Sequence, residues 1–541
     1  MPSTPIDARR ITVHHGPRTV LRDVDLRVHH HSRIGLIGPN GSGKSTLLRV
    51  LAGVARPDSG TVRRAGTIGH LPQVTGETDD TPARDVALAR AGVAAAVRDL
   101  DAHAARLAAG DLDAVGPHAA ALDRWLALGG DDADARLAIA ADELGLPAAL
   151  LDRPIGALSG GQAAKVGLVA LRISRHDVVL LDEPTNHLDA DGLAALDRFL
   201  REHRGGAVIV SHDRALMEEA VGEVVVLDAQ SGRAEHHGGG YAVWERSREE
   251  ARRRAHREHE HAVAARDQLR RAEDEARRRA AEGLRRTRGG RGMADGDKHT
   301  AEWVRSRAEG VQRRARVIAG RVATLDVPEK PWEPGPLRLE LTPAERRSAW
   351  VVALEGVVLR LGAWSLGPID QTVAYGERML LSGPNGAGNS TLIGALAGRV
   401  RPADGIRRVE GGAQIAELGQ ARRLLVGHAG TAAQAVAALA GLSQTDARTT
   451  LATFGLGAEV VQRPSGTLSP GELTRAELAV LAGRRTTCLV LDEPTNHLDV
   501  ASLEAVEAAL AGWPGALVVA SHDQRFREAL EVTRTVTLPA Q

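Results

Sequence analysis

Two short apolar runs in this chain of 541 residues each end in a pair of acids. The first run covers 178–181 and precedes Asp182 and Glu183, and the second contains Cys488 and precedes Asp492 and Glu493. A short apolar run of this kind is typical of a strand buried on both faces of a parallel sheet. Ligands bind at the carboxyl ends of such strands. The pattern therefore predicts an α/β fold in which each half of the chain delivers two carboxylates to a ligand site.

The segment between the two halves has a different pattern. From Trp244 to about Leu325 it is rich in Arg, Glu and Ala, and its glycines fall near the middle and at 310 and 320. This predicts two helices joined by a turn at 283–300. One helix has apolar residues at alternating spacings of four and three, and the other has a thinner alanine-rich stripe. These positions are Val304, Ala308, Val311, Ala315, Ile318, Val322 and Leu325, and Ala262, Leu269, Ala276 and Ala280. An antiparallel helical hairpin is expected.

The boundaries follow from these patterns. We expect a first domain at 1–243, a helical hairpin linker at 244–330 with its tip at 283–300, and a second domain at 331–541. The first domain has an additional stretch rich in Ala, Leu and Asp at about 84–150, which predicts extra helices packed around residues such as Trp125.

Each domain contains a glycine-rich phosphate-binding loop, GPNGSGKST at 38–46 and GPNGAGNST at 383–391. In such loops backbone amides cradle phosphate, a lysine contacts the outer phosphates and the next hydroxyl holds magnesium. The candidate nucleotide-binding residues are Gly38, Pro39, Asn40, Gly41, Gly43, Lys44, Ser45 and Thr46 in the first loop, and Gly383, Asn385, Gly386, Gly388, Asn389, Ser390 and Thr391 in the second.

Further motifs follow each loop in the same order. They are Gln73, LSGGQ at 158–162, NHLD at 186–189 and SHD at 211–213, and then Gln420, LSPGE at 468–472, NHLD at 496–499 and SHD at 521–523. In this chemistry Asp182 assists magnesium, Glu183 polarises the attacking water and His212 senses the γ-phosphate. The expected activity is ATP hydrolysis with Mg2+. One motif by itself would also fit surface acids and a strand cap, but the repeated series does not.

The order of these motifs resembles the ATP-binding cassette superfamily over nearly the whole chain. The resemblance implies two cassettes with the P-loop NTPase fold, paired within one monomeric chain so that each LSGGQ-like motif completes the opposite site. One site then combines Lys44, Ser45, Gln73, Asp182, Glu183 and His212 with Ser469 and Gly471. The other combines Asn389, Ser390, Gln420, Asp492, Glu493 and His522 with Ser159, Gly160 and Gly161. Magnesium is expected at Ser45, Gln73 and Asp182, and at Ser390, Gln420 and Asp492.

The two sites differ at one position of the phosphate loop, where Asn389 replaces lysine. Asparagine is neutral and shorter, so it cannot supply the charged contact to the β- and γ-phosphates. We expect weaker ATP binding or slower hydrolysis in the second site, although the retained Glu493 argues against an inactive one. A tolerated substitution with a small effect is the alternative. Lysine occurs at 44, 165, 298 and 330, so the second domain contains none.

Composition excludes a membrane-spanning protein and an internal disulfide, and charge is distributed unevenly along the chain. The formal net charge is zero, but residues 245–330 carry 24 Arg and Lys against 16 Asp and Glu. No stretch approaches the roughly 18–20 apolar residues that span a bilayer, and the single Cys488 suits core packing in a reducing compartment. We therefore expect a cytoplasmic protein. The basic residues of the tip, which suit RNA phosphates and bases, are Arg285, Arg286, Arg288, Arg291 and Lys298.

Twin cassettes with a long helical linker and no membrane domain resemble the ABC-F family of ribosome-associated ATPases. The resemblance implies that the ATP-closed form binds the ribosome, that hydrolysis releases it, and that the linker tip touches rRNA and the P-site tRNA. The insertion at 84–150 then corresponds to an arm near the E site, or is an enlarged helical subdomain. Protection of the ribosome against antibiotics is favoured over a general translation role. The energising subunit of a transporter is the alternative from another class.

Overall fold

The computed structural model describes residues 4–72, 80–186, 188–288, 306, 310, 313, 316–324, 328, 349–362, 364–384, 386–419, 424–425, 427–484, 486–495 and 498–539. Contacts divide the chain into one unit made of Met1–Trp244 with Pro334–Gln541, and a second unit, Glu245–Glu333. The first unit holds both cassettes, and the second holds most of the linker. Each unit is described by itself below.

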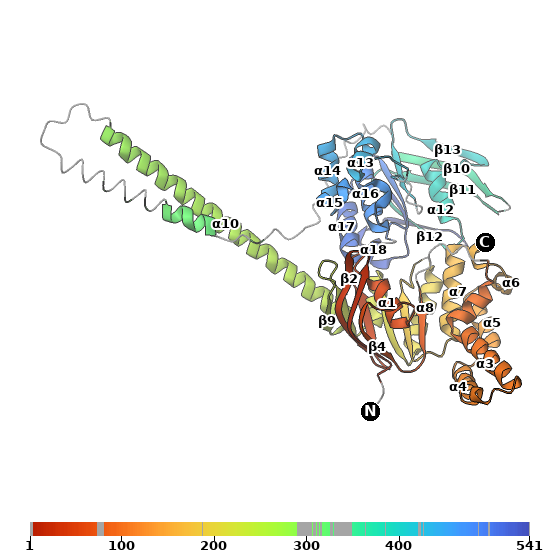
Figure 1. Ribbon diagram of the computed structural model, residues 1–541. Coiled ribbons are helices and arrows are strands. Elements are labelled where there is room, and N and C mark those ends of the chain that lie inside the picture. Colours follow the sequence, from red (N-terminus) through yellow and green to blue (C-terminus); the bar gives the residue numbers. More distant parts are fainter. Residues whose placement is uncertain are drawn as a thin grey trace, which may run out of the picture. The chain divides into compact units, whose positions relative to one another are not determined.

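The first cassette contains two sheets (Figure 1). The larger has the order β5-β6-β7-β3-β8-β9 and is parallel except for its last strand. Its strands are β3 (Arg33–Ile37), β5 (Ile68–Leu71), β6 (Val178–Asp182), β7 (Gly206–Val210), β8 (Glu223–Leu227) and β9 (Ala234–Gly238). The smaller is antiparallel in the order β2-β1-β4, with β1 (Ile6–His15), β2 (Arg18–Val28) and β4 (Ser59–Arg64). The predicted buried strand is thus β6, an interior strand that pairs in parallel with β5 and β7.

Every residue of β6 is buried, and its side chains alternate between two hydrophobic cores. Val178 and Leu180 join the core under the small sheet and α1 (Lys44–Ala52), whereas Val179 and Leu181 face the helical side. A strand buried on both faces needs no polar alternation. Its position fixes Asp182 at the carboxyl edge of the sheet.

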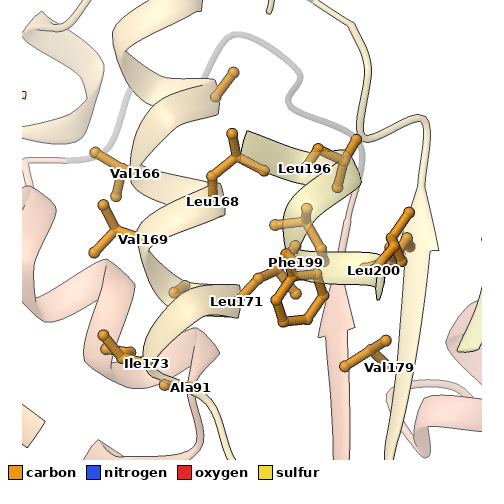
Figure 2. Packing of buried hydrophobic residues seen from close by; sticks show 14 of the residues in the cluster. Ala91, Val166, Leu168, Val169, Leu171, Ile173, Val179, Leu196, Phe199 and Leu200 are labelled. Carbon is orange, nitrogen blue, oxygen red and sulfur yellow. The ribbon is translucent and has the colours of Figure 1, made fainter. Parts of the chain in front are cut away.

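The remaining helices of the first cassette pack on the other face of this sheet or on one another. They are α2 (Ala83–Arg90), α3 (Val93–Ala108), α4 (Val115–Ala127), α5 (Ala133–Glu143), α6 (Ala148–Leu151), α7 (Gly160–Ile173), α8 (Ala190–Glu202) and α9 (Arg214–Ala220). Figure 2 shows α7 and α8 packing through Leu171 and Phe199 onto Val179. Burying one such side chain stabilises the fold by about 1.5–3 kcal/mol. The insertion at 84–150 is helical, as its composition predicts, and Trp125 packs against this core.

The second cassette repeats this plan. Its parallel sheet has the order β14-β15-β16-β12-β17, and its antiparallel sheet has the order β11-β10-β13. The strands are β10 (Trp350–Leu361), β11 (Trp364–Ala374), β12 (Arg378–Ser382), β13 (Asp404–Val409), β14 (Ile415–Leu418), β15 (Cys488–Asp492), β16 (Ala516–Ala520) and β17 (Arg534–Thr537). The helices are α12 (Asn389–Ala397), α13 (Ala432–Ala440), α14 (Gln444–Thr453), α15 (Ala458–Gln462), α16 (Pro470–Gly483), α17 (Val500–Ala511) and α18 (Gln524–Ala529). Cys488 is fully buried in β15, as expected of a core residue.

The linker begins as one long helix, α10 (Gly240–Arg288). Its 49 residues correspond to about 74 Å. The helix continues past Gly283, so Arg285, Arg286 and Arg288 belong to its last turns and not to a glycine-rich turn beginning at 283. A segment without proline, supported by pairs such as Glu273 with Arg277, tolerates one interior glycine at about 1 kcal/mol.

The chain returns along α10 within the second unit. Residues 316–324 are helical, and His259 Nδ1 lies 2.8 Å from the carbonyl oxygen of Pro328. Ala262, Leu269, Ile318 and Val322 from the predicted stripes are half-buried. The stripe positions 304, 308, 311, 315 and 325 lie outside the described residues, and the side chains of 276 and 280 are not described.

Candidate functional site

The first phosphate loop joins β3 to α1, and Lys44 is the first residue of that helix. Gly43 has a φ of 98°, and a Cβ there would lie 2.8 Å from side-chain atoms of Val20 and Leu21. The turn therefore requires glycine. Lys44 Nζ donates to the carbonyl oxygens of Gly38 at 2.7 Å and Pro39 at 3.1 Å. The ammonium group thus lies inside the loop, where phosphate oxygens can take the place of these carbonyls.

Glu183 follows β6 in a left-handed conformation with a φ of 50°. Its own N–H donates to the Val210 carbonyl at 2.8 Å. Burial raises the pKa of its carboxyl group to about 8, although the charge of Lys44 acts in the opposite direction. Glu183 Oε2 accepts from the N–H of His212 at 3.3 Å, and Oε1 lies 3.1 Å from His212 Nε2. A carboxyl group with a pKa near neutrality is suited to accept a proton from water.

The residues predicted to hold magnesium lie next to this acid. Burial raises the pKa of Asp182, and a hydrogen bond with Ser45 and the charge of Lys44 oppose that shift. Hydroxyl and carboxylate oxygens are ligands that Mg2+ accepts. The pair formed by Ser45 and Asp182 therefore fits a magnesium ion bound together with phosphate.

The serines of the two LSGGQ-like motifs cap helices. Ser159 forms a capping box with Gln162 at the start of α7, and Ser469 forms one with Glu472 at the start of α16. Pro470 occupies the first turn of α16, where backbone N–H groups have no intrahelical acceptor. The lack of an N–H in proline therefore removes no hydrogen bond of the helix. The proline in LSPGE thus leaves the helix start intact, and each amino end carries a partial positive charge.

Two cavities combine residues of both cassettes. One, of about 460 Å3, is lined by Lys44, Asp182, Glu183 and His15 of the first cassette and by Ser469 of the second. The other, of about 500 Å3, is lined by the second phosphate loop together with Ser159, Gly160 and Gly161 of the first cassette. Their similar volumes allow similar ligands.

A second cross-cassette contact reaches the first phosphate loop. Asp499 Oδ2 accepts from the N–H of Asn40 at 3.3 Å. Burial would raise the pKa of Asp499, but hydrogen bonds from Ser502 and the charges of Arg475 and His212 lower it overall. Asp499 is therefore a carboxylate at the edge of the first site.

The second site repeats the geometry with weaker contacts. Asn389 Nδ2 lies 3.5 Å from the Gly383 carbonyl, whereas Lys44 makes two shorter contacts in the first loop. Glu493 has a φ of 46°, and its Oε1 lies 3.6 Å from His522 Nε2. Trp364 and Leu361 line this cavity. The glutamate–histidine arrangement is thus present in both sites, with the longer distance in the second.

The remaining predicted residues are placed as follows. Thr46, Gly41, Ser390, Thr391, Gly386, Gly388 and Asp492 line the cavities of their own cassettes. Gly471 lies in the first turn of α16 but is not among the residues that line the first cavity. Gln73, Gln420, Asn385, Arg291 and Lys298 lie outside the described residues.

Comparison with known proteins places this geometry in a family. The family profile described as "ABC transporter" matches residues 21–186 and 366–496. The tylosin resistance ATP-binding protein TlrC of Streptomyces fradiae is 35% identical over 549 residues, which cover 97% of this chain and 96% of the relative. The energy-dependent translational throttle protein EttA of Haemophilus influenzae is 31% identical, covering 95% and 88%. The chain belongs to the ABC-F family of ATP-binding cassette proteins.

The solved structures agree with an ABC fold. A crystal structure of the archaeal ribosome recycling factor aABCE1 with the stalk protein aP1 superposes with a TM-score of 0.55 at 19% identity, covering 98% of this chain and 87% of that one. At this identity the likeness concerns the fold. Within the described part of this ABC-F chain, no helix is both long and apolar enough to cross a membrane. The two cassettes and the ABC-F relatives identify the chain as an ATPase.

Sequence reasoning missed some residues of the sites. Asp499 belongs to the repeated NHLD motif, so the repeat itself was a signal, but its contact with Asn40 joins residues 459 positions apart. Arg18 also lines the first cavity, and no motif marks it.

Proposed function

We propose that this ABC-F protein is an ATPase that binds the ribosome in its ATP-closed form and leaves on hydrolysis, protecting the ribosome against an antibiotic. The observation that carries this proposal is the similarity to TlrC over 97% of this chain and 96% of TlrC, because the linker region is included with both cassettes. Similarity to EttA over a comparable length supports the ribosome as the partner. Regulation of translation is the second role that this similarity supports.

The first site has the residues for the hydrolytic step. ATP binds with its outer phosphates at Lys44 and the amides of the loop, and Ser469 approaches from the second cassette. Ser45, Asp182 and Gln73 would hold magnesium, which would supply positive charge to the phosphates when bound. Glu183 accepts the proton of the attacking water, and the contact with His212 keeps that carboxyl group oriented. Positioning and charge neutralisation are sufficient for phosphoryl transfer to water.

The second site turns over more slowly in this proposal. Asn389 offers no positive charge to the phosphates, and its amide lies 3.5 Å from the Gly383 carbonyl oxygen. Glu493 and His522 are retained at 3.6 Å, which supports slow hydrolysis over none. The enzyme is then asymmetric, with a fast first site and a weakened second site.

The linker tip is the proposed contact with ribosomal RNA and the P-site tRNA. The excess of basic over acidic residues across 245–330 supports this contact. Arg285, Arg286, Arg288, Arg291 and Lys298 are the residues assigned to it. The chain is proposed to act in the cytoplasm as a monomer, because its two cassettes pair with each other.

Co-sedimentation with ribosomes tests the proposal. The double variant Glu183→Gln, Glu493→Gln should pellet with ribosomes in ATP, because both sites then hold ATP without hydrolysing it. A matched control adds Lys44→Ala, which removes the charge that binds ATP in the first site and should abolish pelleting. Replacing the three tip arginines at 285, 286 and 288 by glutamine should weaken pelleting and reduce its dependence on salt.

The outcomes separate the candidate roles. ATP-dependent pelleting together with rescue of translation from tylosin supports ribosome protection. Pelleting with slowed translation and no rescue supports a regulatory role. No pelleting of the double variant, also after Asn389→Lys, refutes ribosome binding and favours an ATPase subunit that energises separately encoded membrane domains.

A further inference from the structure

A buried ion pair joins the two cassettes beside the first catalytic site. Arg214 donates through Nη1 to Glu507 Oε2 at 3.1 Å, and its Nη2 also donates to Glu507 Oε1. Arg214 is 7% exposed, and the Glu507 side chain is 12% exposed. A bidentate guanidinium–carboxylate contact fixes the relative orientation of the two side chains as well as their separation. This contact therefore holds the start of α9 at a defined place on α17.

The first of these residues is close in sequence to the catalytic histidine. His212, Asp213 and Arg214 are consecutive, and Asp213 caps α9 by accepting from the N–H of Leu216 at 3.0 Å. The same short segment presents the N–H and ring of His212 to Glu183. A displacement of Arg214 therefore moves the segment that orients the proposed base.

The equivalent pair is not formed on the other side. Aligning the SHD motifs places Gln524 opposite Arg214, and counting from the NHLD aspartates places Asp197 opposite Glu507. Gln524 Nε2 donates to Glu528 on its own helix, and Asp197 pairs with Arg201 on its own helix. The neutral Gln524 cannot replace an arginine in an ion pair.

The histidine–glutamate distances follow the same asymmetry. Where Arg214 is tied to the opposite cassette, His212 Nε2 and Glu183 Oε1 are 3.1 Å apart. Where Gln524 occupies that position, His522 Nε2 and Glu493 Oε1 are 3.6 Å apart. The side with the cross-cassette ion pair thus has the closer catalytic contact.

We infer that Arg214 is a positioning residue for ATP hydrolysis in the first site, and that its ion pair with Glu507 makes the working geometry of His212 and Glu183 depend on the pairing of the cassettes. This inference rests on the proposed catalytic roles of Glu183 and His212. Arg214 acts through His212. Pairing with the second cassette thereby affects the geometry of the first site, because Glu507 on α17 holds Arg214 in place.

Steady-state kinetics of the full-length protein test this inference in a Glu493→Gln background, where turnover reports the first site. Arg214→Gln copies the residue of the second cassette, and it should lower kcat about tenfold, since small misplacements near a reacting centre have effects of this order or larger. KM for ATP should stay within about twofold, because uniform ground-state binding is not removed. Arg214→Lys should recover part of kcat.

A double-mutant cycle and a matched control complete the experiment. Glu507→Gln should have a similar effect to Arg214→Gln, and the two together should be no worse than one, because paired residues are not additive. Arg525→Gln removes another cross-cassette ion pair, with the 47% exposed Glu218, and should leave kcat unchanged. Melting temperatures show that each variant is folded.

Four results would overturn the inference. An unchanged kcat in Arg214→Gln removes the positioning role. An equal loss in Arg525→Gln, or additive losses in the cycle, makes the effect a general weakening of the interface. Glu183→Gln in the same background must abolish turnover; if it does not, the proposed catalytic assignment fails and the inference fails with it. Loss of turnover in Glu183→Gln with normal turnover in Arg214→Gln overturns the inference alone.

Discussion

Restoring lysine in the second phosphate loop is the sharpest test of the difference between the two sites. Asn389→Lys places an ammonium group at the first position of α12, as Lys44 is placed in α1. The loop glycine before each residue has nearly the same conformation, with φ of 102° at Gly388 and 98° at Gly43. The added side chain therefore enters a loop already shaped to receive it.

The expected gain follows from the contacts in the first site. Lys44 Nζ makes two hydrogen bonds inside its loop, at 2.7 Å and 3.1 Å, whereas the Asn389 amide makes one contact at 3.5 Å. Charge-assisted hydrogen bonds are roughly twice as strong as neutral ones, and one such phosphate contact is equivalent to about 2–4 kcal/mol. The affinity of the second site for ATP should rise about 30-fold to nearly a thousandfold.

Equilibrium dialysis of ATP measures this in a Glu183→Gln, Glu493→Gln background, where nucleotide is not consumed. The parent should show one tight and one weak site, and Asn389→Lys should show two tight sites. Asn389→Gln, which lengthens the side chain without adding charge, should stay like the parent. The reciprocal Lys44→Asn should make both sites weak. Two equally tight sites in the parent, unchanged by Asn389→Lys, would refute the reasoning from charge.

Other expected outcomes concern proton binding and backbone shape. In a Glu493→Gln background kcat/KM for ATP should rise with pH and level off above about 8, because the base works as a carboxylate and burial raises the pKa of Glu183 to about 8. A flat profile from pH 6 to 9 would contradict this. His70 lies in β5, and burial lowers its pKa from 6.5 to about 4 on folding. Its stabilising contribution is therefore complete above pH 6.5 and is lost as the pH falls toward 4. Between pH 7 and 5 the parent should lose up to about 2 kcal/mol more unfolding free energy in urea than His70→Gln, and equal losses would assign the acid sensitivity elsewhere. Gly43→Ala should lower melting temperature and ATP affinity together, since its Cβ would meet Val20 and Leu21 at 2.8 Å; a variant with parental values would show that the loop adjusts.

Local patterns in the sequence were sufficient to predict most of each cassette. The apolar run at 178–181 became β6, and the glycine before Lys44 adopts the positive φ that its motif requires. The 84–150 insertion is helical, and Cys488 is buried. These features depend on residues within one element or on a short loop. Their physical causes are therefore readable from spacing and residue type.

Apart from the LSGGQ-like motifs, which the family resemblance assigned to the opposite sites, contacts between the cassettes were not predictable from local patterns. The pair of Arg214 and Glu507 joins residues 293 positions apart, and neither lies in a motif that names a partner. The pKa of Glu183 depends on burial by elements from distant parts of the chain. The helix α10 ends at Arg288, later than the glycine at 283 predicts, because an arginine- and glutamate-rich helix tolerates one interior glycine.

Each of the differences between the two sites leaves the second cassette with the weaker contact. The second loop lacks lysine, the second SHD motif is followed by Gln524, and the second histidine–glutamate contact is the longer one. The second cassette nevertheless places Ser469 at the first cavity, Asp499 against the first phosphate loop and Glu507 against Arg214. In the proposed asymmetric enzyme, the second cassette therefore acts mainly as the partner that completes the first site. Substitutions on α16 and α17 should therefore reduce turnover at Glu183, in the opposite cassette, more than turnover at Glu493.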